Sequence, residues 1–287
     1  MAYLSIKICG KRGNMLLTTC DEDRVSAVYC STYQPGDMIT LEIGEPNQFC
    51  VVQFEDTMPP ALVYICQQRI VFPVPISESP MPNPYSPKSF IGNLHIIRAR
   101  FATPEEIARR RNLAFNPYDN AFYGMGPFGN GKDTGFFPHA TSNIEPTSPG
   151  FAPRTAIDGV LENSAHMVWP YQAWSNDRKP EAELTIDFGR PVCIDELRLT
   201  LRADFPHDSW WTDADVRFSD GSTEHLTLER TGKIQSFAIK PRTVTCLTLC
   251  NLQKHEDTSL YTALTQIEAW GTDAASDMPR SKSSEKK

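Results

Sequence analysis

The sequence predicts an all-β protein built from two β-sandwich, jelly-roll-like domains. Short apolar–polar alternations recur over residues 1–100 and again over 141–271, and this period of two is typical of half-buried strands. The 23 prolines and the scarcity of helical periodicity agree with short strands separated by turns. We therefore expect an N-terminal domain over 1–100, a connecting segment over 101–140, a second domain over 141–271 and a disordered tail over 272–287.

In the N-terminal half, apolar residues occupy every second position of LSIKIC at 4–9 and MITLEI at 38–43. Each pattern predicts a strand with one buried face. No group of reactive side chains stands out in this half. We expect Glu55, His95 and Arg98 to be solvated strand positions, because ionisable side chains are seldom buried.

One short helix is expected in the connecting segment. Thr103 can cap it, Pro104 suits the first turn, and Glu106 completes a capping box. The arginines at 109–111 would end the helix, where the dipole favours positive charge. Residues 116–140 then mix glycines with aromatic side chains, which flexible linkers lack, so we expect this stretch to pack against one or both sandwiches.

Composition excludes several classes of partner and site. A net charge of −7 and a pI near 5.4 argue against nucleic acid or an anionic membrane as the main partner. No stretch reaches the length of a membrane-spanning helix, and the first residues lack the apolar run of a secretory signal. The eight cysteines show no CxxC spacing, so we expect reduced thiols and no zinc site. These features favour a cytoplasmic, bacterial protein.

The second half carries several motifs in a definite order. An Ala-x-Asp-Gly turn at 156–159 comes first, and a Trp-Ser pair follows at 174–175. An alternating strand then ends in Asp-Phe-Gly at 187–189, and IEAWG at 267–271 closes the series. In this order the motifs resemble the discoidin-like family, also called the coagulation factor V/VIII type C or galactose-binding-like fold.

The resemblance implies an eight-stranded jelly roll with its ligand site on the loops at one end. Many members bind galactose-type or other sugars, and others bind lipid head groups or proteins. It therefore implies non-catalytic binding of a mono- or oligosaccharide. It also implies a structural Ca²⁺ near the Asp-Gly turn, held by Asp158 and Glu268, since Ca²⁺ collects oxygen ligands. The alternative is that Asp158 caps its own turn and Glu268 is an ordinary edge residue.

The stretch RADFPHDSWW at 202–211 concentrates polar and aromatic side chains at the end of an apolar strand pattern. An indole can stack on the C–H face of a pyranose, while Arg, Asp and His form hydrogen bonds with its hydroxyls. A long loop at 160–172 adds further rings. We predict that the two stretches line a sugar pocket made of His166, Trp169, Tyr171, Arg202, Asp204, His207, Asp208 and Trp211.

The alternation of faces along a strand predicts different positions for the neighbouring residues Trp210 and Trp211. Counting back by twos from Val216 puts Trp210 on the core side of its strand and Trp211 on the outer side. Trp174 occupies the Trp-Ser position of the resemblance and is expected in the core. Trp211 or Trp169 would then be the stacking platform.

Three alternatives to sugar binding remain open. In a structural interpretation, Arg202 forms an ion pair with Asp204 or Asp208. In an enzymatic one, Asp204, His207 and Asp208 perform acid–base chemistry in a glycan-acting hydrolase or lyase. In the third, the chain is a structural or subunit-interaction protein whose tryptophans are buried against another chain, as in a homo-oligomer.

Overall fold

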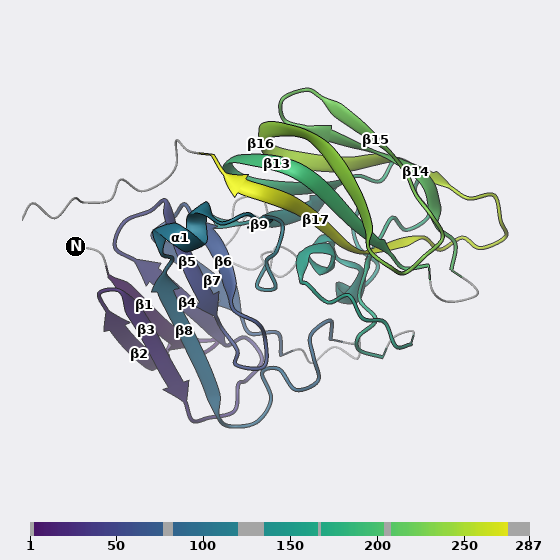
Figure 1. Ribbon diagram of the computed structural model, residues 1–287. Helices are drawn as coiled ribbons and strands as arrows, with labels where there is room; N and C mark the ends of the chain where they lie inside the picture. Colours follow the sequence, from purple (N-terminus) through teal and green to yellow (C-terminus); the bar gives the residue numbers. More distant parts are fainter. Residues whose placement is uncertain (1–2, 77–82, 120–134, 166–167, 204–207, 275–287) are drawn as a thin grey trace, which may run out of the picture.

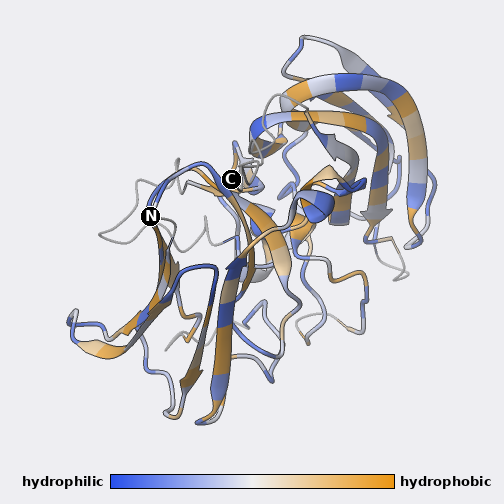
Figure 2. Ribbon diagram, turned by 60° about the vertical axis from the view of Figure 1, so that its left-hand side comes forward, coloured by the Kyte–Doolittle hydropathy of each residue, from blue (hydrophilic) through white to orange (hydrophobic). Residues whose placement is uncertain are grey.

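The computed structural model describes residues 3–76, 83–119, 135–165, 168–203 and 208–274 (Figure 1). Strands dominate both halves, and the predicted all-β class is confirmed. Figure 2 shows hydrophobic and hydrophilic residues alternating along many of these strands, as half-buried sheets require. The predicted disordered tail over 272–287 is wrong at its start, because the last strand continues to Asp273, which is buried, whereas residues 275–287 lie outside the described residues.

The N-terminal domain is a pair of antiparallel sheets packed around one core. Buried aliphatic residues such as Ile6, Leu41 and Ile97 form that core. The first sheet has the order β2-β1-β4-β7 and contains β1 (Leu4–Cys9), β2 (Met15–Asp21), β4 (Met38–Ile43) and β7 (Arg69–Pro73). The second has the order β10-β6-β5-β8-β3 and contains β3 (Arg24–Tyr29), β5 (Gln48–Gln53), β6 (Ala61–Ile65), β8 (His95–Phe101) and β10 (Phe136–Phe137).

The C-terminal domain is one sheet that folds over on itself (Figure 1). Its order is β12-β17-β13-β16-β14-β15, with β11 added to β13 and β9 added to β17. The strands are β9 (Arg111–Asn112), β11 (His139–Ser142), β12 (Trp174–Ser175), β13 (Leu184–Leu201), β14 (Trp211–Phe218), β15 (Thr223–Thr227), β16 (Gln235–Lys254) and β17 (Ala263–Asp273). Two 3₁₀ helices, η1 (Pro149–Phe151) and η2 (Pro153–Ile157), precede β12.

Two long strands let this sheet close around its core. In β13, residues 184–187 pair with β11, whereas residues 192–201 pair with β17. The partner strand β16 spans both parts, and the register between β13 and β16 shifts after Asp187 and again after Ile194. Such irregularities bend a strand. The result is a curved sheet whose inner side buries a single cluster of apolar residues.

The helix α1 (Pro104–Ala108) begins with the predicted capping box. The expectation that the arginines end it is wrong, because its last turn contains no basic residue. Instead, Arg110 binds Asp195 at 2.7 Å, and Arg111 in β9 pairs with Asp273. The chain leaves the helix early because these arginines attach it to the C-terminal sheet. None of the helices in the described ranges has the length and apolar character needed to span a lipid bilayer.

The connecting segment passes between the two domains more than once. β9 joins the C-terminal sheet, Tyr118 then enters the N-terminal core 5.1 Å from the ring of Phe54, and β10 pairs with β6. β11 returns to the C-terminal sheet. The predicted packing is therefore confirmed for the described flanks, whereas residues 120–134 lie outside the described residues.

Two buried arginines of the C-terminal domain stack on aromatic rings of the N-terminal domain. The guanidinium of Arg154 in η2 lies 4.2 Å from the ring centre of Tyr85. That of Arg190 in β13 lies 4.9 Å from the ring centre of Phe49. Arg190 also donates from Nε to Asp273 at 2.5 Å. Contacts of this kind fix the two domains against each other.

The expectation that Glu55 and His95 are solvated is wrong. Both side chains are at most 2% exposed, and His95 Nδ1 lies 3.0 Å from Glu55 Oε2. Each group supplies a partner to the other, which makes the burial of two polar side chains tolerable. Arg98 is exposed, as expected.

The domain interface should contribute strongly to stability. We expect Arg190→Ala to lower the free energy of unfolding by about 1–3 kcal/mol, because it removes a buried hydrogen bond to Asp273, which keeps its pair with Arg111. Denaturant unfolding measures this. As the control, Arg217→Ala breaks an exposed pair with Glu183 and should change stability by no more than about 0.5 kcal/mol. Equal effects of the two variants would contradict the role given to Arg190.

Candidate functional site

Four loops meet at one end of the C-terminal sandwich. The backbone N–H of Ser209 donates to the Tyr261 carbonyl at 3.0 Å, and Arg230 donates to the Asp208 carbonyl at 3.3 Å. Arg202 reaches a third loop, where its guanidinium donates to the Tyr171 carbonyl. The described parts of these loops are 158–165 with 168–173, 202–203 with 208–210, 228–234 and 255–262. The two stretches predicted to form a site therefore do lie together.

Arg202 and Asp208 lie beneath this loop cluster. Both side chains are buried, and Arg202 Nε lies 4.0 Å from Asp208 Oδ2. The ion pair expected in the structural interpretation is therefore confirmed for Asp208. Because Arg202 also binds the Tyr171 carbonyl, it ties the loop before β12 to the loop after β13. These contacts hold the loops in place from below.

The predicted orientation of the two neighbouring tryptophans is wrong. Trp211 is 1% exposed and lies in the core, 6.0 Å from the ring of Trp174, which is buried as expected. Trp210 is only partly buried and stacks on His255, with 3.8 Å between ring centres. Two register shifts near the start of β14, around Asp213, explain the error, since an irregular strand breaks the alternation of faces.

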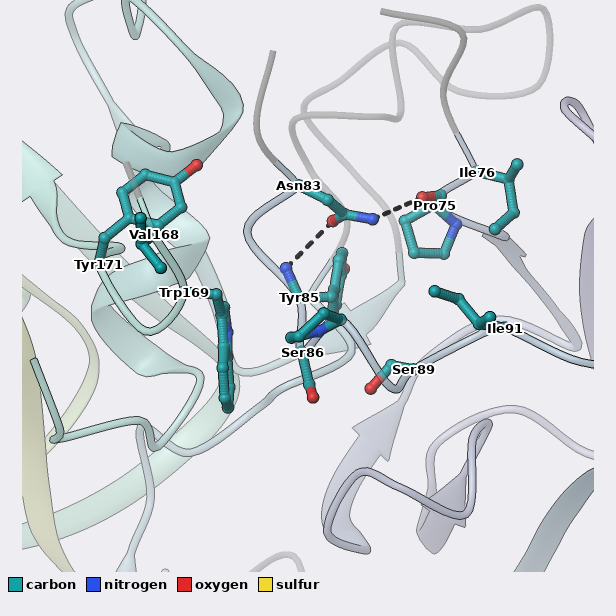
Figure 3. A pocket seen from close by; sticks show the side chains of 11 residues that line it. Pro75, Ile76, Asn83, Tyr85, Ser86, Ser89, Ile91, Val168, Trp169 and Tyr171 are labelled. Carbon is teal, nitrogen blue, oxygen red and sulfur yellow. Dashed lines mark hydrogen bonds between the residues drawn. The ribbon is translucent and has the colours of Figure 1, made fainter. Parts of the chain in front are cut away.

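A cavity of about 510 Å³ lies where this loop cluster faces the N-terminal domain (Figure 3). One wall comes from the loop before β12, and the other comes from residues 83–91 and from Pro75 and Ile76, which follow β7. The described lining residues are Pro75, Ile76, Asn83, Tyr85, Ser86, Pro87, Ser89, Ile91, Val168, Trp169 and Tyr171. None of these is an Asp, Glu, His, Lys or Arg, so the described walls are uncharged.

Aromatic and hydroxyl groups share the cavity. Figure 3 shows the Trp169 ring standing upright, with one flat face turned toward Tyr85 and Ser86. The indole Nε1 of Trp169 is buried and has no hydrogen-bond partner within the described part of the chain. The side-chain amide of Asn83 already has hydrogen-bond partners within the protein. Its Nδ2 donates to the Pro75 carbonyl, and its Oδ1 accepts from the Tyr85 N–H. It shapes the wall and leaves the hydroxyls and Trp169 to face a ligand.

The five predicted site residues that the structure describes divide into three groups. Trp169 and Tyr171 line the cavity, whereas Arg202 and Asp208 support it and Trp211 belongs to the core. The remaining three, His166, Asp204 and His207, lie outside the described residues.

Sequence reasoning missed the wall at 83–91 because it belongs to the other domain. Its one signal is the run NPYSP at 83–87, where a tyrosine sits among turn residues. Nothing in that run indicates which distant loop it faces.

Amide donors surround Asp158, the residue expected to hold Ca²⁺. Its Oδ1 accepts from the Gln266 side chain at 2.8 Å and from the Val160 N–H at 2.9 Å, and Oδ2 accepts from Gln172 at 3.4 Å. Burial raises the pKa of this carboxyl to about 6. Glu268 instead accepts from the Trp270 indole at 2.5 Å. The described contacts match the capping alternative and do not fit a shared cation, and calcium binding stays a prediction.

Comparisons with known proteins show similarity at the level of solved structures. No known protein family matches the chain, and no curated protein matches it in sequence. One similar structure is chitosan-binding module 1 of a chitosanase/glucanase from Paenibacillus sp. IK-5, with 16% identity, a TM-score of 0.36, and coverage of 56% of this chain and 99% of that one. Another is a Streptococcus pneumoniae fucose-binding module, with 12% identity, a TM-score of 0.36, and coverage of 55% and 96%.

A third similar structure is the family 32 carbohydrate-binding module of Streptococcus pneumoniae EndoD, with 14% identity and a TM-score of 0.38. It covers 47% of this chain and 97% of that one. These neighbours are carbohydrate-binding modules, the kind of protein that the resemblance in the sequence implies. At TM-scores below 0.5 they carry no argument about the ligand of this chain, which has to come from the site itself.

The corrected positions of the tryptophans give a stability prediction. We expect Trp211→Ala to lower the free energy of unfolding by about 3–5 kcal/mol, because it empties a fully buried site against Trp174. Trp210→Ala should cost less, since part of that indole already faces water. Chemical denaturation of both variants tests the order, and a larger loss for Trp210→Ala would contradict it.

The network around Asp158 gives a second prediction. Asp158→Ala leaves the buried Gln266 amide without one of its acceptors, so we expect a loss of about 1–3 kcal/mol with or without Ca²⁺. Thermal melts in EDTA and in added Ca²⁺ measure this. A wild-type melting temperature that rises with Ca²⁺, and a variant that loses this response, would instead support calcium at Asp158.

Proposed function

We propose that the protein binds a mono- or oligosaccharide, without catalysis, in the cavity between the Trp169 loop and residues 83–91. The observation that carries the proposal is the position of Trp169, whose ring lines a cavity of about 510 Å³. Cavities of roughly 300–1,000 Å³ with aromatic walls and a few polar groups suit small ligands. Trp169 also lies on the loop that the sequence predicts as part of a sugar site.

The walls match the two kinds of surface that a pyranose presents. The flat face of Trp169 can pack on a patch of sugar C–H groups. The hydroxyl of Ser86, which is partly exposed in the same lining, can exchange hydrogen bonds with sugar hydroxyls. Apolar neighbours such as Ile91 and Val168 would keep water from competing for these contacts.

The enzymatic alternative finds no support among the described residues. Acid–base cleavage of a glycosidic bond uses a pair of carboxyl groups placed on either side of it. The described lining has no carboxyl or imidazole group, and Asp208 is buried against Arg202. Asp204 and His207 lie outside the described residues. Binding without turnover is therefore the function that the described geometry supports best.

The subunit-interaction alternative needs tryptophans that face another chain. Trp174 and Trp211 are instead buried against each other within this chain. Trp210 is covered by its own His255. Among the five tryptophans, Trp169 is the one that lines a described cavity, which favours a small ligand over a partner surface.

Trp169→Ala tests the proposal. Calorimetric titration with a panel of uncharged mono- and oligosaccharides should identify a ligand of the wild type. The variant should bind that ligand at least about tenfold more weakly, since a loss of 1.4 kcal/mol is a factor of ten. It should also unfold at nearly the same denaturant concentration, because the ring faces a cavity.

Trp210→Ala is the matched control, since it removes another indole from the same end of the sandwich. It should retain wild-type affinity because His255 covers its ring. Binding that survives Trp169→Ala but is lost in Trp210→Ala would move the site to the surface near His255. A panel without any ligand would refute carbohydrate binding.

A further inference from the structure

The N-terminal wall of the cavity rests on a buried acid and a buried imidazole. His95 Nδ1 lies 3.0 Å from Glu55 Oε2, and His95 Nε2 lies 3.3 Å from the carbonyl of Gly92, at the end of the wall. The backbone amides of Thr57 and Phe90 also act on the Glu55 carboxyl, where they lower its pKa against the larger effect of burial. One carboxyl group therefore connects β8, the turn after β5 and the loop that forms the wall.

Further contacts carry this support to the lining itself. Thr57 Oγ1 lies 2.8 Å from Oγ of Ser89, a lining residue. Phe90 has a positive φ of 63°, a conformation uncommon for side chains other than glycine and asparagine, and its ring is buried. The ring of Tyr85, which also lines the cavity, meets Phe90 edge-on at 5.7 Å. The shape of the wall thus depends on what holds Phe90 and Ser89.

Hydrogen-bond chemistry fixes where the protons lie. A carbonyl oxygen only accepts, so the contact with Gly92 requires a hydrogen on His95 Nε2. In the neutral ring Nδ1 is then an acceptor, and the Glu55 carboxyl needs a proton to face it. Burial lowers the pKa of His95, and burial together with the adjacent Asp56 raises the pKa of Glu55 to about 8. Both directions favour a neutral pair at pH 7.

The other ionisable groups around the pair do not change charge near pH 8. Desolvation raises the pKa of Asp56, but hydrogen bonds, among them one from the Ile96 N–H at 3.4 Å, lower it further, so this carboxyl stays ionised. Burial raises the pKa values of Tyr33, whose ring lies 4.4 Å from that of His95, and of Tyr118. Both phenols therefore stay protonated. Two further neighbours, Tyr29 and Asp37, act on Tyr33.

We propose that Glu55 and His95 are positioning residues for the carbohydrate site, and that loss of the Glu55 proton loosens the 83–92 wall and weakens binding. Once Glu55 has lost its proton, its buried carboxylate would repel the neighbouring carboxylate of Asp56. It would also face His95 Nδ1, which carries no hydrogen to donate. Relief of that repulsion moves the Glu55 carboxylate away from Thr57 and Phe90, so the 83–92 loop loses part of its support. This inference rests on the proposed function, because the wall matters only if the cavity binds a ligand.

Glu55→Gln tests the inference, because glutamine stays neutral and can still donate an N–H to His95. For the wild type, affinity for the uncharged sugar found in the panel should fall about tenfold between pH 7 and pH 9, as the protonated fraction of Glu55 falls to about one tenth. Glu55→Gln should bind equally well at both pH values. Glu45→Gln, which alters an exposed glutamate, should behave as the wild type.

A measurement without ligand separates this inference from the proposed function. Hydrogen exchange of the backbone amides at 83–92, corrected for the intrinsic effect of pH, reports the wall directly. If protection falls above pH 8 in the wild type but persists in Glu55→Gln, the protonation state of Glu55 controls the order of the wall. This result would stand even if no sugar binds. If the hydrogen-exchange protection and the sugar affinity of the wild type both stay constant from pH 7 to pH 9, the inference is wrong. This comparison uses the wild type alone, so it does not depend on whether a variant folds.

Discussion

The rest of the structure depends on the charged and aromatic contacts buried between the two domains. Arg190 places a guanidinium against Phe49 of the N-terminal domain while binding Asp273 of its own. A buried charge is costly unless it is paired, so this contact is stable only while both domains keep their places. Arg154 repeats the arrangement on Tyr85, with its Nε donating to the Asp119 carbonyl at 2.7 Å.

This constraint explains why the connecting segment is part of both domains. Asp119 lies in that segment and binds His139 at 2.8 Å and the N–H of Ala140 at 2.8 Å, close to where the chain returns to the C-terminal sheet. Gly189 belongs to the same contact, because a side chain there would overlap the ring of Phe137. The segment thus acts as a third layer of the interface, and the two sandwiches form one unit with a cavity between them.

The cavity is a consequence of that unit and belongs to neither domain alone. Trp169 comes from a loop held by Arg202, whereas Tyr85 comes from a loop held by Glu55 and His95. Each wall is supported by buried polar groups that do not themselves enter the lining. This arrangement separates the uncharged surface offered to a ligand from the ionisable groups that set its shape. Bacterial origin and a cytoplasmic location stay predictions.

The sequence by itself determined the all-β class and the capping box at Thr103, because each depends on neighbours close in the chain or on strand periodicity. The burial of Trp174 followed from the Trp-Ser position of the family resemblance. It also placed Trp169 in the loop that lines the cavity. The tertiary structure decided the rest. Register shifts in β14, set by its partner strand, turned Trp211 inward. The burial of Glu55 required contacts 40 residues away at His95, and the second wall of the cavity came from another domain. Local sequence patterns do not indicate which residues distant in the chain will contact each other. Such contacts stabilise the protein only after the chain has brought the distant segments together.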